Sequence, residues 1–266
     1  GCSSGCSFVV SSSAICGPGS LRQAINDVCS GGTIVFASSL AGQTINLTSG
    51  EIVLNKSLTI DAEAAPGLTI SGNNSSRIFR INSGKEVILR YLTLANGSES
   101  SVNKPCATVA CGGAIYNAFT LTIQYSTLKD NWVEPYPAGA GGAIYNTGTL
   151  LLLHSTLANN STKFGGALQT VGTATVLNST FSNNSAENFG HSIFNNGSLL
   201  INQSTLLYTI GATPGNVWNS VNGTSLIQNS INQCQWQLPE RRPARHQSSS
   251  GCGLRHWQRR IRLCSK

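Results

Sequence analysis

The chain of 266 residues contains no methionine, and only 10% of its residues are charged. Its acidic residues are three Asp, at positions 27, 61 and 130, and seven Glu, which is too few for an Asp-rich calcium site. No CxxC pair or Cys/His cluster indicates zinc. No apolar run is long enough to cross a membrane, and no apolar leader precedes the body, which favours a mature form. We therefore expect no metal, no other cofactor and no membrane span.

The net charge of +7 is confined to one end of the chain. Residues 1–234 contain nine basic and nine acidic side chains, whereas residues 235–266 contain eight basic side chains and one acidic one. A neutral body argues against nucleic acid as its partner. The tail lacks the pattern of the body, and three interpretations stay open: an out-of-frame end, a disordered tail, or a basic binding element.

The nine cysteines point to an oxidising environment. Two close pairs, Cys16 with Cys29 and Cys106 with Cys111, predict disulfides that close short loops. Such bonds persist outside the cytoplasm, so the sequence predicts an extracellular or cell-surface protein.

Glycine, serine, threonine and asparagine are abundant, and they recur with a period. The hexapeptide GGAIYN begins at Gly112 and again at Gly141, and weaker copies begin at Gly165 and Gly190. The spacings are 29, 24 and 25 residues, and each copy is followed by a run such as TLTIQYSTLKDN. A repeat of this length is typical of a solenoid, in which each unit buries one face against its neighbours.

Apolar residues alternate within each unit, as in Leu121 with Ile123 and Leu150 with Leu152, which indicates strands. We therefore predict an all-β fold, a right-handed, single-stranded parallel β-helix that is monomeric. Residues 1–32 would hold an N-terminal segment and a capping helix over LRQAINDV with Ser20 as its N-cap. Residues 33–234 would form seven or eight coils, a rod of about 35 Å, followed by the basic tail at 235–266.

The run SLRQAIN, followed by GGTIVF, LTI and repeated GGAIYN with ST(L/F)xxN, resembles bacterial β-helix proteins of the pectin-lyase-like superfamily. It is most similar to secreted repeat proteins with an SLREAI-type start, and more loosely to polymorphic outer-membrane adhesins. The resemblance covers residues 16–230. It implies the fold and a bacterial surface setting, and it leaves open lyases, hydrolases and adhesins.

Stacked coils turn each repeat position into a column of side chains. Most columns are expected to be structural ladders of asparagine or stacked aromatic rings. Function is expected where the period fails, in three insertions over residues 98–111, 132–140 and 208–218. These would emerge along one edge as a lip that binds a polysaccharide, a cell-surface glycan or a surface partner, because aromatic rings stack on sugars. Its substrate-binding residues would be Lys104, Trp132, Tyr136 and Trp218.

Three more functions are compatible with particular residues of the chain. A glycoside hydrolase would use Asp130 and Glu134 as its carboxylate pair, although Asp130 also fits a corner ladder. A polyuronate lyase would draw on Arg80 and Arg90, if these share a face. Ice binding would use a threonine column that includes Thr127, but flanking residues of unequal size, from Tyr125 to Asn178, argue against a flat face.

Overall fold

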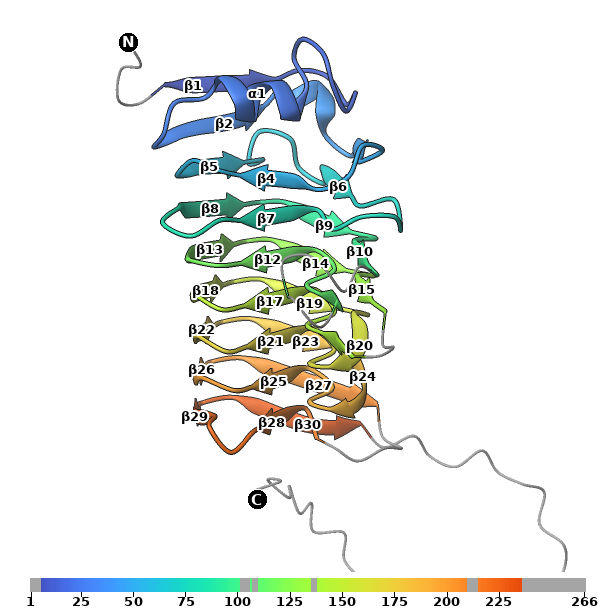
Figure 1. Cartoon of the computed structure of the whole chain (residues 1–266), viewed down its shortest axis with the longest axis vertical. Coiled ribbons are helices and arrows are strands. Elements are labelled where there is room, and N and C mark those ends of the chain that lie inside the picture. Colours follow the sequence, from blue (N-terminus) through green and yellow to red (C-terminus); the bar gives the residue numbers. More distant parts are fainter. Residues whose placement is uncertain (1–5, 101–105, 107–109, 135–137, 210–214, 236–266) are drawn as a thin grey trace, which may run out of the picture.

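The computed structural model describes residues 6–100, 106, 110–134, 138–209 and 215–235 (Figure 1). They form a parallel β-helix of about eight turns, which confirms the predicted fold class. Figure 1 shows the coils stacked along one axis, from β1 and β2 at one end to β28, β29 and β30 at the other. Residues 236–266 of the predicted basic tail lie outside the described residues.

Four sheets, A to D, run along the axis. The four central coils, residues 86–195, pass through them in the chain order A, B, D, C, whereas the described strands of the coils before and after these belong to sheets A, B and C. Sheet A contains β1 (Ser7–Val10), β2 (Gly32–Phe36), β5 (Leu58–Asp61), β8 (Glu86–Arg90), β13 (Thr120–Gln124), β18 (Thr149–Leu153), β22 (Thr173–Leu177), β26 (Ser198–Asn202) and β29 (Thr224–Gln228). Sheet B contains β3 (Thr44–Asn46), β6 (Thr69–Ser71), β9 (Thr93–Ala95), β14 (Thr127–Lys129), β19 (Thr156–Ala158), β23 (Thr180–Ser182), β27 (Thr205–Thr209) and β30 (Ile231–Gln235).

The other two sheets are C and D, and sheet D spans only the central coils. Sheet C contains β4 (Ile52–Leu54), β7 (Phe79–Ile81), β12 (Ile115–Asn117), β17 (Ile144–Asn146), β21 (Leu168–Thr170), β25 (Ile193–Asn195) and β28 (Val217–Asn219). Sheet D contains β10 (Ser98–Glu99), β11 (Ala110–Cys111), β15 (Trp132–Val133), β16 (Gly139–Ala140), β20 (Ser161–Phe164) and β24 (Ser185–Phe189). It holds the first two insertions, whose strands pair as β10 with β15 and β11 with β16, so the predicted contact between them is confirmed.

The alternation within each strand places every second side chain in the core. In one coil Ile115, Leu121, Ile123 and Leu128 are fully buried. Burying an aliphatic side chain of this size contributes roughly 1.5–3 kcal/mol. Because the same positions are apolar in successive coils, one continuous core runs through the solenoid.

The predicted capping helix is α1 (Leu21–Asp27), and the Ser20 side chain accepts a hydrogen bond from the Gln23 backbone N–H. It buries Leu21, Ala24 and Ile25 at the N-terminal end of the core, and a short 3-10 helix, η1 (Ser38–Leu40), follows in the next coil. The sequence did not indicate β1, which pairs with β2 and extends sheet A by one strand. Four residues, SFVV, carry too little periodicity to be distinguished from a loop.

The corners are fixed by residues that accept a left-handed backbone. The first glycine of the hexapeptide has a φ of 61° at Gly141, where a Cβ would lie 2.1 Å from the Ile144 carbonyl oxygen. At the corner between sheets B and D, a buried ladder of Asn131, Asn160 and Asn184 bonds successive coils through their amides. The hexapeptide is therefore scaffold, as the repeat predicted.

One predicted disulfide is confirmed and the other is wrong. Cys106 and Cys111 are bonded within the first insertion. Cys16 is a free, exposed thiol, and Cys29 is disulfide-bonded, so the two do not pair. The backbone N–H of Cys29 also lies against Cys6 Sγ, at 3.1 Å. Proximity in the sequence therefore did not identify the partner of Cys29.

In the part of the chain that the structure describes, no helix has the length and apolarity needed to cross a membrane.

Candidate functional site

The predicted lip is built around sheet D, and the structure places only some of its residues. Trp132 is half-buried on β15, in register with Ser98 and Ser161. Lys104 and Tyr136 lie outside the described residues. Trp218 belongs to sheet C, not to the lip. Its strand lies three coils beyond the coil that contains Trp132, which is a separation of roughly 14 Å along the solenoid axis. The lip therefore does not bring the two tryptophans together as neighbours.

The predicted carboxylate pair falls on two different kinds of position. Asp130 is an exposed corner residue with a φ of 56°, and its Oδ1 accepts a hydrogen bond from Asn159 Nδ2 at 3.2 Å. Glu134 follows β15 and is half-buried, and its backbone N–H donates to the Glu99 carbonyl oxygen at 3.0 Å. Asp130 thus occupies the corner ladder, the structural role that its column indicated.

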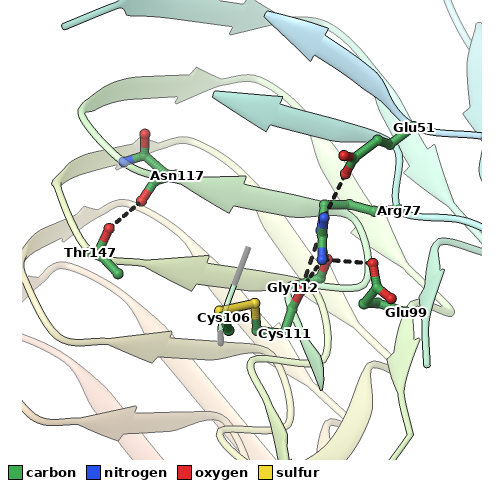
Figure 2. Close-up of a disulfide and its surroundings, with 8 residues drawn as sticks. All are labelled: Glu51, Arg77, Glu99, Cys106, Cys111, Gly112, Asn117 and Thr147. Atoms are coloured by element: carbon green, nitrogen blue, oxygen red, sulfur yellow. Dashed lines mark hydrogen bonds and ion pairs between the residues drawn. A yellow bond between two sulfur atoms is a disulfide. The ribbon is translucent and has the colours of Figure 1, made fainter. Parts of the chain in front are cut away.

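Beneath the lip, a buried arginine ties the first insertion to the body (Figure 2). The Arg77 side chain is 1% exposed and lies 2.5 Å from the Glu51 carboxylate and 2.8 Å from that of Glu99. It also donates to the backbone carbonyls of Cys111 and Gly112. Figure 2 shows Arg77 between the two carboxylates, beside the Cys106–Cys111 disulfide. These contacts hold both ends of the insertion.

A second feature lies where the outer face of sheet C meets β20 and β24. The outer position of sheet C is aromatic in four of its strands, and each of β20 and β24 ends in a phenylalanine. We call these residues the aromatic strip: Tyr116, Tyr145, Phe194 and Trp218 from sheet C, with Phe164 and Phe189 from sheet D.

The rings of the strip stack on one another. The rings of Tyr116 and Tyr145 are parallel to within 10°, and their centroids are 6.0 Å apart. The ring centroids of Phe189 and Trp218 are 4.6 Å apart. Phe164 contacts both Phe189 and Phe194, which joins the two sheets. Trp218 is 38% exposed, and the other rings are half-buried. The strip is thus a stacked, partly solvent-facing surface along the solenoid axis.

The strip also carries polar groups. Burial raises the pKa of Tyr145 above its ordinary value of 10.0, and the neighbouring Tyr116 phenol raises it further. Gln169 occupies the outer position between Tyr145 and Phe194. Phenol and amide groups among rings can bind a ligand that has both apolar faces and hydroxyls.

Tyr116, Tyr145 and Phe194 are each the fifth residue of a hexapeptide copy, so the sequence predicted them only as members of a structural ladder of aromatic rings. It did not indicate Phe164 and Phe189. A signal was present, because each of these phenylalanines directly precedes the first glycine of a hexapeptide copy, in KFGGA and NFGHS. The equivalent positions in the two perfect copies are Cys111 and Ala140.

The two arginines expected in a polyuronate-lyase site lie on different sheets. Arg80 is on sheet C, 3.0 Å from Glu51, whereas Arg90 is on sheet A and is paired with Asp61. The predicted shared face is therefore wrong.

The two histidines within the repeats are held by structural contacts. His154 stacks on Tyr125 at 5.0 Å, which continues the ladder of its column. His191 is buried, and its Nδ1 accepts a hydrogen bond from the Ala186 backbone N–H.

The threonine column is longer than the sequence indicated. The register of sheet B aligns seven threonines in consecutive strands, without a register shift: Thr44, Thr69, Thr93, Thr127, Thr156, Thr180 and Thr205. The residues of unequal size beside it, such as Tyr125 and Asn178, have positive φ and lie on the corner outside the strands. They therefore lie outside the strands that carry the threonine column.

Among the described residues, no group of three or more His, Cys, Asp or Glu is placed to hold a metal ion. No protein-family model matches the chain, and a search of curated proteins finds no significant relative.

Proposed function

We propose that this protein is an extracytoplasmic β-helix protein that binds carbohydrate through the aromatic strip. The observation that carries the proposal is the column of partly exposed rings on the outer face of sheet C, namely Tyr116, Tyr145, Phe194 and Trp218, which Gln169 interrupts once. Pyranose rings offer apolar C–H faces that pack on aromatic rings, and their hydroxyls reach polar groups beside them. A run along the solenoid axis suits an extended chain better than a single sugar.

The charge of this face favours a neutral glycan. Arg80 is the one charged residue among the described outer positions of sheet C, and it is paired with Glu51. On the neighbouring β20 and β24, Lys163 and Glu187 carry opposite charges. A polyuronate would bring a row of carboxylates to a surface with no compensating row of cations.

The setting is part of the proposal. The Cys106–Cys111 disulfide supports an oxidising compartment, and the SLRQAIN start with its GGAIYN repeats supports kinship with the pectin-lyase-like β-helix proteins. We propose the bacterial cell surface or the extracellular medium, where polysaccharides are exposed.

The test is affinity electrophoresis in gels that contain one polysaccharide each: mixed-linkage β-glucan, xyloglucan, galactomannan or, as the acidic arm, polygalacturonate. We expect retardation by at least one neutral polysaccharide and its loss in Trp218→Ala. Phe119→Ala is the matched control, because Phe119 is an exposed ring, at 42%, between β12 and β13 and outside the strip. Equal retardation of both variants would contradict the proposal. Release of reducing ends that stops in Asp130→Asn or Glu134→Gln would assign a hydrolase instead.

Ice binding is a second candidate function, favoured by the seven threonines in register on sheet B. Threonine is stiff at χ1, so the column presents methyl and hydroxyl groups at a regular spacing of about 4.8 Å. If this function holds, the protein enters a growing ice front, and Thr156→Lys is excluded from it. Thr149→Lys, on sheet A of the same coil, should enter like the wild type. Exclusion of the wild-type protein from ice would end this candidate.

A further inference from the structure

The last described coil, which holds β28, β29 and β30, forms one end of the solenoid (Figure 1). Each of these strands is the outermost strand of its sheet in the part of the chain that the structure describes. The main-chain N–H and C=O groups on their outer edges therefore face no further described strand. At the opposite end, α1 packs beside β1 and buries its apolar side chains on the core. The two ends of the solenoid thus differ, and only the first is capped by a helix.

The core itself is exposed at the last coil. The column of inward-facing residues that contains Ile123, Leu152 and Ile201 is fully buried, but its last member, Ile227, is 39% exposed. Ten large apolar side chains are exposed among the described residues, and five of them belong to this coil: Trp218, Val221, Leu226, Ile227 and Ile231. Such a concentration of exposed apolar side chains is typical of a surface that binds a partner.

The edge of this coil also lacks the features that keep edge strands apart. Edge strands of monomeric proteins are commonly protected by charged side chains, by proline or by a bulge. Residues 215–235 contain no Asp, Glu, Lys, Arg or Pro. Their strands pair with the preceding coil without a register shift. The edge is therefore regular and uncharged, and another strand can add to it.

The absence of charge decides which occupant suits this end. Residues 236–266 follow it directly in the chain, and they carry eight basic side chains and one acidic one. They would bring these charges to a surface that has no acidic group, and burying an unpaired charge is costly. A second copy of the protein brings an equally apolar and uncharged end. Two-fold dimers, in which the same surface serves both subunits, are the commonest homo-oligomers.

We propose that two copies of the protein dimerise end to end through the last coil, with β29 of one copy antiparallel to β29 of the other. A two-fold axis through Leu226, normal to sheet A, places Ser225 of each copy opposite Ile227 of its partner. Residues opposite each other in an antiparallel pair point to the same face of the sheet. The exposed end of the core column is then covered by the partner. The dimer is independent of the proposed glycan binding, and it differs from the monomer that the sequence predicted.

The test is sedimentation equilibrium of the full chain at about 1–200 μM. The contact is one coil across, at the small end of protein interfaces, so we expect a reversible dimer with a dissociation constant of about 10 μM. Ile227→Lys charges the edge and should raise this constant at least about tenfold. Ile88→Lys is the matched control, because Ile88 is exposed to the same degree, 38%, on sheet A but lies five strands away. It should leave the constant within a factor of about two.

A second variant, Leu226→Lys, keeps the test independent of folding. Leu226 is 53% exposed and alternates with the core-facing Ile227, so a lysine there should melt like the wild type but repel its own copy in the dimer. Higher salt should tighten the wild-type dimer, because it screens the repulsion between the two basic tails that start at the junction. A wild-type protein that stays monomeric throughout overturns the inference. A dimer that survives both edge variants, or that Ile88→Lys disrupts equally, also overturns it, because the contact then lies elsewhere.

Discussion

Replacement of Arg77 by methionine should destabilise the protein strongly, because Arg77 is a buried charge with two carboxylate partners. The guanidinium is 1% exposed, while the Glu51 and Glu99 side chains are 20% and 14% exposed. In the variant, Glu51 can still pair with Arg80, which lies 3.0 Å away. The interactions lost are therefore mainly the ion pair with Glu99 and the hydrogen bonds to the carbonyls of Cys111 and Gly112. Removing one partner of a buried ion pair costs roughly 3–5 kcal/mol. We expect Arg77→Met to lower the free energy of unfolding by about 4 kcal/mol.

Urea unfolding followed by far-ultraviolet circular dichroism measures this change. The control is Arg80→Met, whose side chain is 28% exposed and whose partner Glu51 keeps its contact with Arg77, so about 1 kcal/mol or less is expected. The triple variant Arg77→Met, Glu51→Gln, Glu99→Gln should recover most of the loss, because no buried charge is then left uncompensated. A loss for Arg77→Met no larger than that for Arg80→Met would refute the reasoning.

Two further predictions concern the corner ladder and the strip. Asn160→Leu removes amide bonds to Asn131, Asn184 and the Leu128 carbonyl, and it should cost about 2–4 kcal/mol in the same assay. Ser161→Ala, at an exposed neighbouring position, should change stability by less than about 0.5 kcal/mol. Because the pKa of Tyr145 is raised, the folded state keeps the phenol proton at pH values at which the unfolded state loses it. The resulting stability is complete below the ordinary tyrosine pKa of 10.0 and falls as the pH rises above it. Tyr145→Phe should make the melting temperature fall less steeply above that pH, and an unchanged slope would contradict this.

The fold could be predicted because a β-helix repeats its constraints in every coil. Alternation at Leu121 and Ile123, together with the glycine at Gly141, specifies strands and corners locally, and stacking then aligns columns such as the threonines of sheet B. The columns predicted from the repeat therefore match the observed register.

The candidate site was harder to predict because it combines residues from two sheets and from several coils. Phe164 and Phe189 join the strip only because the last residues of β20 and β24 lie beside sheet C, a relation that no spacing in the sequence reveals. Trp218 was assigned to an insertion, yet it is the next ring of the sheet C column.

The ion pairs of Arg77 were also beyond prediction from the sequence. They reach Glu51 in the preceding coil and Glu99 in the insertion, and neither carboxylate stands at a repeat position shared with Arg77. Periodicity aligns equivalent positions only, so it does not indicate a contact between residues of different columns.

The central claim is that the exposed rings of the aromatic strip bind a neutral glycan, and the double variant Phe194→Ala, Trp218→Ala tests it most directly. The measurement is the calorimetric dissociation constant for the neutral polysaccharide that retards the wild type most in the gel assay. Each ring should contribute about 1–1.5 kcal/mol, so we predict a rise of about 30- to 150-fold. Phe119→Ala should leave the constant within a factor of about two. A double variant that binds as tightly as Phe119→Ala would contradict the account.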